Sequence, residues 1–315
     1  MINGKQTNQA QQMTQQSINR PILGATLVVS GMLIIGFIDN FIKEIAEDAG
    51  LWQFHFMRAA IICATVLVLA QVFRWRLAPR NWPAVALRSL FFSISMVLYF
   101  GAAGMLPIAE VGAGLFLSPI FVLLVSIGFL NLRVGIWRIL AVGLGFSGVL
   151  VILRPDPNNL SILTFIPIIA GFFYALCIIA TRRWCEGETT LTLLVGAFGA
   201  LGIWGLAGLV FFSFFTAPPE LADLLPFFTM GWVAVTPKFM FWLFVQAYGS
   251  LAAVWLLTRG YQMGEVSFIS VFEYSFLVFA AFWAWILWGE TMDLAGTIGV
   301  IAIILSGVII ALRSR

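Results

Sequence analysis

The feature that most constrains this chain is a series of long apolar segments, which begins at Pro21 and continues almost to the last residue. Crossing the hydrocarbon core of a bilayer takes about 20 predominantly apolar residues. Lipid offers no hydrogen-bond partner to an exposed backbone group, so each crossing segment must be an α-helix. We expect ten such helices, near residues 22–43, 51–73, 82–104, 108–129, 134–153, 162–181, 190–215, 238–258, 266–288 and 294–312.

The composition agrees with a membrane protein and argues against several other classes. Of the 315 residues, 61% are hydrophobic and only 10% are charged, whereas soluble domains carry about 25% charged residues. A soluble enzyme, a nucleic-acid-binding protein and a disordered scaffold are therefore all disfavoured. The net charge of +3 is dispersed along the chain, and the three cysteines lack paired spacing. We therefore expect no nucleic-acid partner, no disulfide framework, no metal and no cofactor.

The distribution of lysine and arginine predicts the orientation in the membrane. Residues 1–20 are rich in glutamine and asparagine, and we expect a disordered cytoplasmic tail there. With that tail inside, twelve basic residues fall on the cytoplasmic side and three outside. The sequence thus predicts a multi-pass protein of the cytoplasmic (inner) membrane, with the lipid bilayer as a partner and both termini cytoplasmic.

An internal repeat divides the chain into two halves. Residues 147–154 read Ser-Gly-Val-Leu-Val-Ile-Leu-Arg and residues 306–313 read Ser-Gly-Val-Ile-Ile-Ala-Leu-Arg, so five of eight positions match. Each segment closes the last helix of its half. Because five helices are an odd number, the second copy enters the membrane in the opposite orientation. The predicted fold is an all-α polytopic protein whose ten helices form two inverted five-helix repeats, 21–154 and 155–315.

Short motifs in both halves resemble the drug/metabolite transporter superfamily, in particular its ten-helix type with two EamA domains. The second half carries Leu287-Trp288-Gly289-Glu290 at the end of the ninth helix, and the tenth helix has a pattern of small residues: Gly296, Gly299, Ser306, Gly307 and Val308. The first half matches at Arg58, Ser118-Pro119 and Gly148-Val149, and it departs at Asn131, where the family usually has an acid. The resemblance covers about 22–313.

The resemblance implies a transporter and leaves the cargo open. Members of the superfamily move amino acids, amines, nucleotide sugars, vitamins or drugs across membranes. Nothing in the chain encodes an ATPase, so we expect transport to be driven by a solute or ion gradient, with a proton or a second solute as the possible coupling partner. The glycine patterns serve internal packing as readily as dimer contacts, so the oligomeric state stays open.

Glu273 is the best candidate for a functional charge, because a charge within the bilayer costs at least about 2.5–3.5 kcal/mol. It lies about a third of the way into the ninth helix, with Ser270 on its face and Tyr274 beside it. One hypothesis is a carboxylate that faces a central cavity and binds a cationic group or a proton. The alternative is a carboxylate, neutral or paired with a base, that only holds helices together.

A second cluster of ionisable residues lies where the first helix ends and the second begins. Asp39, Asn40, His55 and Arg58 all fall in the outer third of the membrane. They form either an outer gate or carboxylate-binding site, or a structural cluster with an Asp39–Arg58 ion pair, which we favour. We expect His55 to be structural.

Three further charged groups are expected near the membrane surfaces. Lys43 shares a helix face with Asp39. Arg88 is expected to extend to the cytoplasmic surface from the first turn of the third helix, and Glu110 to be solvated.

Aromatic residues provide 15% of the chain, and some share helix faces with polar groups. Such faces beside one acid suit an organic cation or an apolar amino acid, although any single ring is as readily explained by packing. The candidates for cavity-lining residues are Trp242 and Gln246 in the eighth helix, Phe92, Ser95 and Tyr99 in the third, and Tyr174 in the sixth.

Several functions compete for this pattern. The first is a secondary carrier for an amino acid or amine, with Glu273 at the ammonium group and Arg58 or Asn40 at a carboxylate. The second is a broad exporter of lipophilic cations or drugs, which needs the acid and the rings alone. A channel or a receptor-like protein is a weaker alternative. We do not expect an enzyme, because no nucleophile is paired with a base at a recognisable spacing.

Overall fold

The computed structural model describes residues 20–103, 111, 114–131, 133–154, 165–289, 291 and 293–313. The expected N-terminal tail up to residue 19 and Glu110 lie outside these residues, as does the side chain of Lys43. The helices are α2 (Pro21–Ile38), η1 (Asp39–Phe41), α3 (Ile42–Asp48), α4 (Leu51–Val72), α5 (Trp82–Ala103), α7 (Ser118–Gly128), α8 (Ile136–Leu153), α9 (Phe165–Arg183), α10 (Thr190–Phe214), α11 (Pro219–Leu224), α12 (Pro226–Thr229), α13 (Pro237–Met263), α14 (Val266–Ile269), η4 (Ser270–Tyr274), α15 (Ser275–Trp288) and α16 (Leu294–Arg313).

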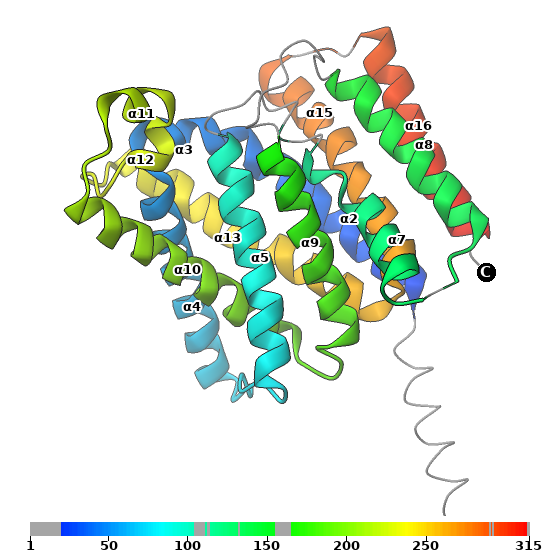
Figure 1. Cartoon of the computed structure of the whole chain (residues 1–315), viewed down its shortest axis with the longest axis horizontal. Helices are drawn as coiled ribbons and strands as arrows, with labels where there is room; N and C mark the ends of the chain where they lie inside the picture. Colours follow the sequence, from blue (N-terminus) through cyan, green and yellow to red (C-terminus); the bar gives the residue numbers. More distant parts are fainter. Residues whose placement is uncertain are drawn as a thin grey trace, which may run out of the picture.

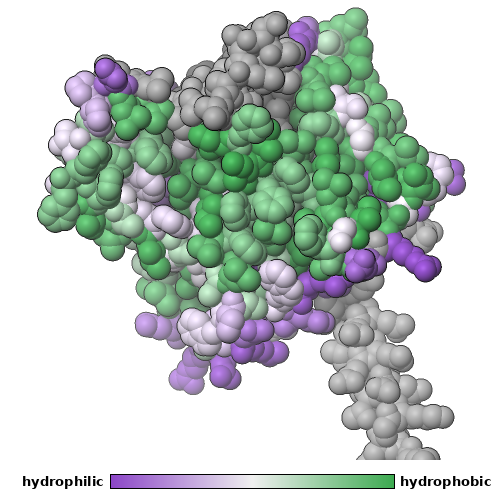
Figure 2. Space-filling model, viewed as in Figure 1, coloured by the Kyte–Doolittle hydropathy of each residue, from purple (hydrophilic) through white to green (hydrophobic). Residues whose placement is uncertain are grey.

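The described helices confirm an all-α polytopic membrane protein. Eight are long and apolar enough to cross a membrane, and two shorter apolar helices, α7 and α8, correspond to the predicted fourth and fifth spans. The visible surface is apolar over a broad band, and hydrophilic residues gather towards its edges (Figure 2). The segment between α10 and α13, for which the sequence predicts no membrane span, contains the short helices α11 and α12.

Two of the predicted spans are interrupted rather than continuous. The first passes from α2 through the 3-10 turn η1 at Asp39 into α3, and so ends at Asp48 instead of near residue 43. The ninth consists of one turn of α14, the 3-10 segment η4 and then α15. Apolar periodicity cannot reveal such interruptions, because a single 3-10 turn, with 3.0 instead of 3.6 residues per turn, is too short to change the apolar pattern visibly.

The helices pair in a pattern with two-fold symmetry (Figure 1). The helices α4 and α10 lie side by side at one end of the molecule, and α8 and α16 at the other. Between them α2 packs on α13 as α9 packs on α5, and α15 packs on α2 as α7 packs on α9. Two copies of one five-helix unit, which the sequence predicts, would give this pattern. The repeat limits at 154 and 155 stay a prediction.

Close approach of backbones at glycine holds two of these pairs together. A Cβ built on Gly148 of α8 would lie 2.7 Å from the carbonyl oxygen of Gly299 in α16, and one on Gly299 would lie 2.7 Å from the carbonyl oxygen of Gly148. Gly24 of α2 and Gly260 of α13 exclude each other's Cβ in the same way, at 2.8 and 2.7 Å. Small residues permit such contacts, which stabilise helix pairs in lipid.

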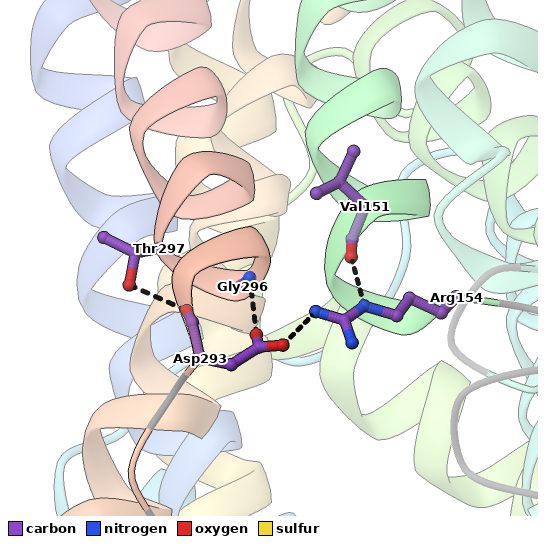
Figure 3. A network of polar contacts seen from close by, with 5 residues as sticks. All are labelled: Val151, Arg154, Asp293, Gly296 and Thr297. Carbon is purple, nitrogen blue, oxygen red and sulfur yellow. Dashed lines mark hydrogen bonds and ion pairs between the residues drawn. The ribbon is translucent and has the colours of Figure 1, made fainter.

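A polar network joins α8 and α16 where the two halves meet at one end of the bundle (Figure 3). Arg154, in the left-handed conformation with φ 44°, ends α8, and its Nη2 lies 2.5 Å from Oδ2 of Asp293. The other carboxylate oxygen of Asp293 accepts from the backbone N–H of Gly296 at 2.9 Å, in the first turn of α16. The Arg154 guanidinium and this N–H lower the pKa of Asp293, so the carboxylate stays ionised at neutral pH.

We predict that Gly148→Ala lowers the free energy of unfolding by about 1–3 kcal/mol, the usual cost of overpacking. The added methyl group would force α8 and α16 apart at the carbonyl oxygen of Gly299. A melting curve of the purified protein measures the effect. The control is Gly143→Ala in the same helix, where an added Cβ meets no atom within 4 Å. Equal melting temperatures for the two variants would contradict the close contact.

Candidate functional site

A cavity of about 110 Å³ lies between the two halves and is bounded by residues of α2, α4, α5, α9, α10, α13 and η4. Water occupies about 30 Å³ per molecule, so this conformation has room for one small organic molecule. Most of the wall is apolar. The polar and ionisable residues that line it are Asp39, Arg58, Arg88, Tyr99, Ser118, Tyr174, Cys177, Thr181, Ser250, Thr258, Tyr261 and Glu273.

Glu273 lies in the wall of this cavity, within the 3-10 segment that interrupts the ninth span. Its side chain is 2% exposed. The hydroxyl of Tyr174, from α9, donates to its Oε1 at 2.8 Å, and the side chains of Tyr261 and Ser118 interact with the same carboxylate. No Lys, Arg or His nitrogen lies within 4.0 Å of it among the described residues.

The two neighbours that were expected to share the site with Glu273 do not reach the cavity. Ser270 is buried and its Oγ has no hydrogen-bond partner among the described residues. Tyr274 packs its ring against Gly145 of α8 and edge-on to Phe116 at 6.5 Å. The 3-10 geometry rotates Tyr274 by about 120° from Glu273, whereas Ser270, three residues before Glu273, stays on its face but is not part of the cavity wall. The described residues show no contact that would support a role in cargo binding for Ser270 or Tyr274, so this role stays a prediction.

Arg58 lines the cavity, and Asp39 faces the same space. The guanidinium of Arg58 stacks over the rings of Phe54 and Phe100, at 4.5 and 4.9 Å from their centroids. Asp39 acts on it electrostatically. A direct ion pair within 4.0 Å, which the sequence favoured, is not formed between them in the described part of the chain.

His55 is fully buried beside Arg58 and does not line the cavity. Its Nδ1 lies 3.2 Å from Nη2 of Arg58 and its ring is edge-on to Phe100 at 5.2 Å. Arginine can only donate, so His55 accepts at Nδ1 and is neutral, with its proton on Nε2. Arg58 also donates a 3.5 Å hydrogen bond to Oγ of Ser250 in α13.

Arg88 does not extend to the cytoplasmic surface as expected; it is 2% exposed and lines the cavity. Three neutral acceptors hold its guanidinium: Oγ1 of Thr181 at 3.1 Å, the carbonyl oxygen of Leu193 at 2.9 Å and Oγ1 of Thr258 at 3.1 Å. These acceptors come from α9, α10 and α13. A sequence signal existed, because Arg88 precedes Phe92 by four residues and so continues the face that Phe92 and Tyr99 occupy.

Some of the other predicted site residues line the cavity, and others form contacts between the surrounding helices. Tyr99 and Tyr174 line the cavity. Ser95 instead donates to the carbonyl oxygen of Ala170, at 2.9 Å, and joins α5 to α9. Gln246 donates to the carbonyl oxygen of Ile38, at 2.8 Å, and joins α13 to α2. Both are buried contacts between the two halves and do not line the cavity.

Trp242 and Asn40 also lie outside the cavity lining. Trp242 stacks on Phe41, with ring centroids 4.0 Å apart. Nδ2 of Asn40 donates to the carbonyl oxygen of Gly36 in its own helix, at 2.6 Å. Helical spacing predicts which residues share a face, but that face can turn towards a neighbouring helix as well as towards a cavity.

Comparison with known proteins shows which proteins this chain is similar to. Residues 22–154 match the EamA-like transporter family. The pseudopaline exporter CntI of Pseudomonas aeruginosa is 23% identical over 287 residues, which are 90% of this chain and 94% of that protein. A riboflavin transporter of Vibrio cholerae is 22% identical over 278 residues, 86% of this chain and 87% of the other. One crystal structure has the same fold, with a TM-score of 0.73, 14% identity and coverage of 91% of this chain and 96% of that one.

We predict that Arg58→Ala lowers the free energy of unfolding by about 2–5 kcal/mol, the range for large-to-small changes in a core. The change removes the stacking on Phe54 and Phe100 and leaves Nδ1 of His55 without a donor. Melting curves measure it, with the exposed Arg76→Ala as a control that removes the same charge. Unchanged melting with a selective loss of carboxylate-bearing cargo would instead assign Arg58 to cargo binding.

Proposed function

We propose that this chain, which carries an EamA-like transporter family domain and is homologous to drug/metabolite transporters, is a secondary carrier for a small organic solute with a positively charged amino group. An amino acid or an amine fits this description. The family and the relatives indicate a transporter rather than an enzyme. Two of those relatives are named for organic cargo, pseudopaline and riboflavin, which supports an organic solute here.

The observation that carries the proposal is the Glu273 carboxylate. It is buried at an interrupted helix, faces the cavity and has hydroxyl partners but no cation within 4.0 Å among the described residues. A buried charge without a counter-ion is unfavourable in a low dielectric. The ammonium group of a cargo would supply the missing charge, and a bound proton would do so when the cargo is absent.

The aromatic wall of the cavity supports the same class of cargo. Phe92, Phe100, Phe116, Tyr99 and Tyr174 present rings to the space beside the carboxylate. Ring faces attract ammonium groups by about 0.5–2 kcal/mol. These rings also favour the second candidate, a broad exporter of lipophilic cations. The buried cation Arg88 in the same wall favours an amino acid over both a lipophilic cation and a simple amine, because a purely cationic cargo leaves Arg88 without a counter-charge.

The arrangement of the helices suits alternating access. The cavity lies between paired helices of the two halves, and both interrupted spans contribute a carboxylate to its wall, Asp39 from η1 and Glu273 from η4. Discontinuous helices near the midplane are typical of carriers in which two halves rock around a fixed site. In our proposal, the halves rock about the helix pairs α4–α10 and α8–α16 in the cytoplasmic membrane.

Both termini are proposed to be cytoplasmic, and reporter fusions test this. Fusions after Arg80 and Arg183 are expected to report the inner side, because the connections α4–α5 and α9–α10 carry the basic residues. A fusion after Glu220, between α10 and α13, is expected to report the outer side. An inner signal at Glu220 would reverse the proposed orientation.

Glu273→Gln is expected to abolish or decouple transport while the protein stays folded. The amide keeps the volume and accepts from Tyr174, but it loses the charge. A charge-assisted contact is worth about 1.5–3 kcal/mol, which corresponds to a loss of roughly ten- to a hundredfold in affinity. Uptake or counterflow of labelled amines in liposomes, normalised to protein amount, measures it beside a melting curve.

The control for that variant is Glu220→Gln, an identical change at an exposed position. It is expected to transport like the wild type. If Glu273→Gln instead melts earlier but binds amines with wild-type affinity, Glu273 is a structural residue and the proposal fails.

A further inference from the structure

Arg88 is a second buried charge in the cavity, and the proposed amine site does not use it. Its Nε, Nη1 and Nη2 each donate to one neutral oxygen, on Thr181, Leu193 and Thr258 respectively. A guanidinium has five N–H groups. Two of them, one on each Nη, therefore have no acceptor among the described residues. No carboxylate oxygen lies within 4.0 Å of this side chain in the described part of the chain.

Arg58, the other arginine of the cavity wall, likewise has no carboxylate within 4.0 Å and no partner for its Nε among the described residues, but its electrostatic surroundings differ. Asp39 faces the same space as Arg58 and acts on it electrostatically, and two aromatic rings cover its guanidinium. Arg88 is instead held by neutral acceptors from three helices, with the ring of Phe92 at 5.6 Å from its guanidinium carbon. Two parallel N–H groups on one guanidinium suit a bidentate contact with a carboxylate.

One face of α9 sets the distance between Arg88 and Glu273. Tyr174 on this helix donates to Glu273, and Thr181 on the same helix accepts from Arg88. Seven residues of α-helix correspond to about 10 Å. Helical side chains lean towards the N-terminus of their helix, so the Tyr174 ring leads away from Thr181 and does not shorten this distance.

We infer that the cargo is an elongated zwitterion, with its ammonium group at Glu273 and its carboxylate at Arg88. This inference rests on the proposed function of Glu273. Two charge-assisted contacts of about 2.8 Å each leave about 4 Å or more between the two charges of the cargo. An α-amino acid carries both groups on one carbon, which separates them by only about 3 Å. The class that fits is an ω-amino acid or a longer molecule with the same spacing.

The wall between the two charges is suited to a hydrocarbon chain. Cys177 lies on the same face of α9 between Tyr174 and Thr181, and Phe92, Ile178 and Leu257 line the cavity with it. None of these side chains carries a charge. Methylene groups between the two ends of the cargo would be removed from water there, which is favourable.

A series of zwitterions that differ only in chain length tests the inference. Purified protein in liposomes is assayed by counterflow and by thermal shift with alanine, β-alanine, γ-aminobutyrate, 5-aminopentanoate and 6-aminohexanoate. n-Butylamine and n-pentylamine serve as probes that have the amine but no carboxylate. Binding is expected to tighten from alanine to the four- to six-carbon ω-amino acids, and these are expected to bind more tightly than the amines.

Substitution of Arg88 assigns the carboxylate contact. Arg88→Gln is expected to weaken the ω-amino acids roughly ten- to a hundredfold and to leave the two amines unchanged. Arg88→Lys keeps the charge but loses the bidentate contact and is expected to fall between. The control is Arg183→Gln, an exposed arginine at the end of α9. If Arg88→Gln does not fold, the wild-type ligand series and Arg88→Lys decide.

The outcomes separate this inference from the proposed function. Glu273-dependent binding of amines, with alanine equal to or better than the ω-amino acids, would overturn the elongated zwitterion and keep the amine carrier. Unchanged affinity of both Arg88 variants for ω-amino acids would also overturn the elongated zwitterion and keep the amine carrier. If none of the probes binds in a Glu273-dependent manner, the proposed function fails first.

Discussion

The structure depends on one constraint. Neither water nor lipid can compensate a charge buried inside a membrane protein, so other groups must compensate it. Four charged side chains line the cavity between the two halves. Arg58 has two rings, His55 and the field of Asp39, whereas the hydrogen-bond partners of Glu273 and Arg88 are neutral and Arg88 has one ring, Phe92, beside it. The first pair is therefore balanced within the protein. In our proposal, the second pair is balanced when a cargo with the opposite charges is bound.

Helix packing and helix interruption together create the place where these charges meet. Reciprocal glycine contacts bring α2 against α13 and α8 against α16 so closely that their backbones touch. These pairs fix the two halves at a short distance, and hydrogen bonds from Ser95 and Gln246 to backbone carbonyl groups tie them together. The 3-10 segments at Asp39 and Glu273 then turn a carboxylate from each half into the remaining space.

Hydroxyl groups hold the charged side chains of the site in place. Tyr174 and Thr181, two turns apart on α9, each hold one of the two uncompensated charges. A single rigid helix thereby determines how far apart the charges lie. In our inference the cargo is selected by length, because a rigid spacing favours the cargo whose own charges match it.

The sequence alone determined the all-α membrane fold, the approximate extent of the spans and Glu273 as the outstanding buried charge. Each of these follows from the free-energy cost of exposing polar groups to lipid. This cost applies to any segment of the chain, whatever its neighbours are. Tertiary structure alone decided which polar faces meet the cavity. Ser95 and Gln246 turn to a neighbouring helix, whereas Arg88 turns inwards to acceptors that come from three distant segments. Helical spacing gives the face on which a residue lies, but the packing of the other helices decides what that face contacts.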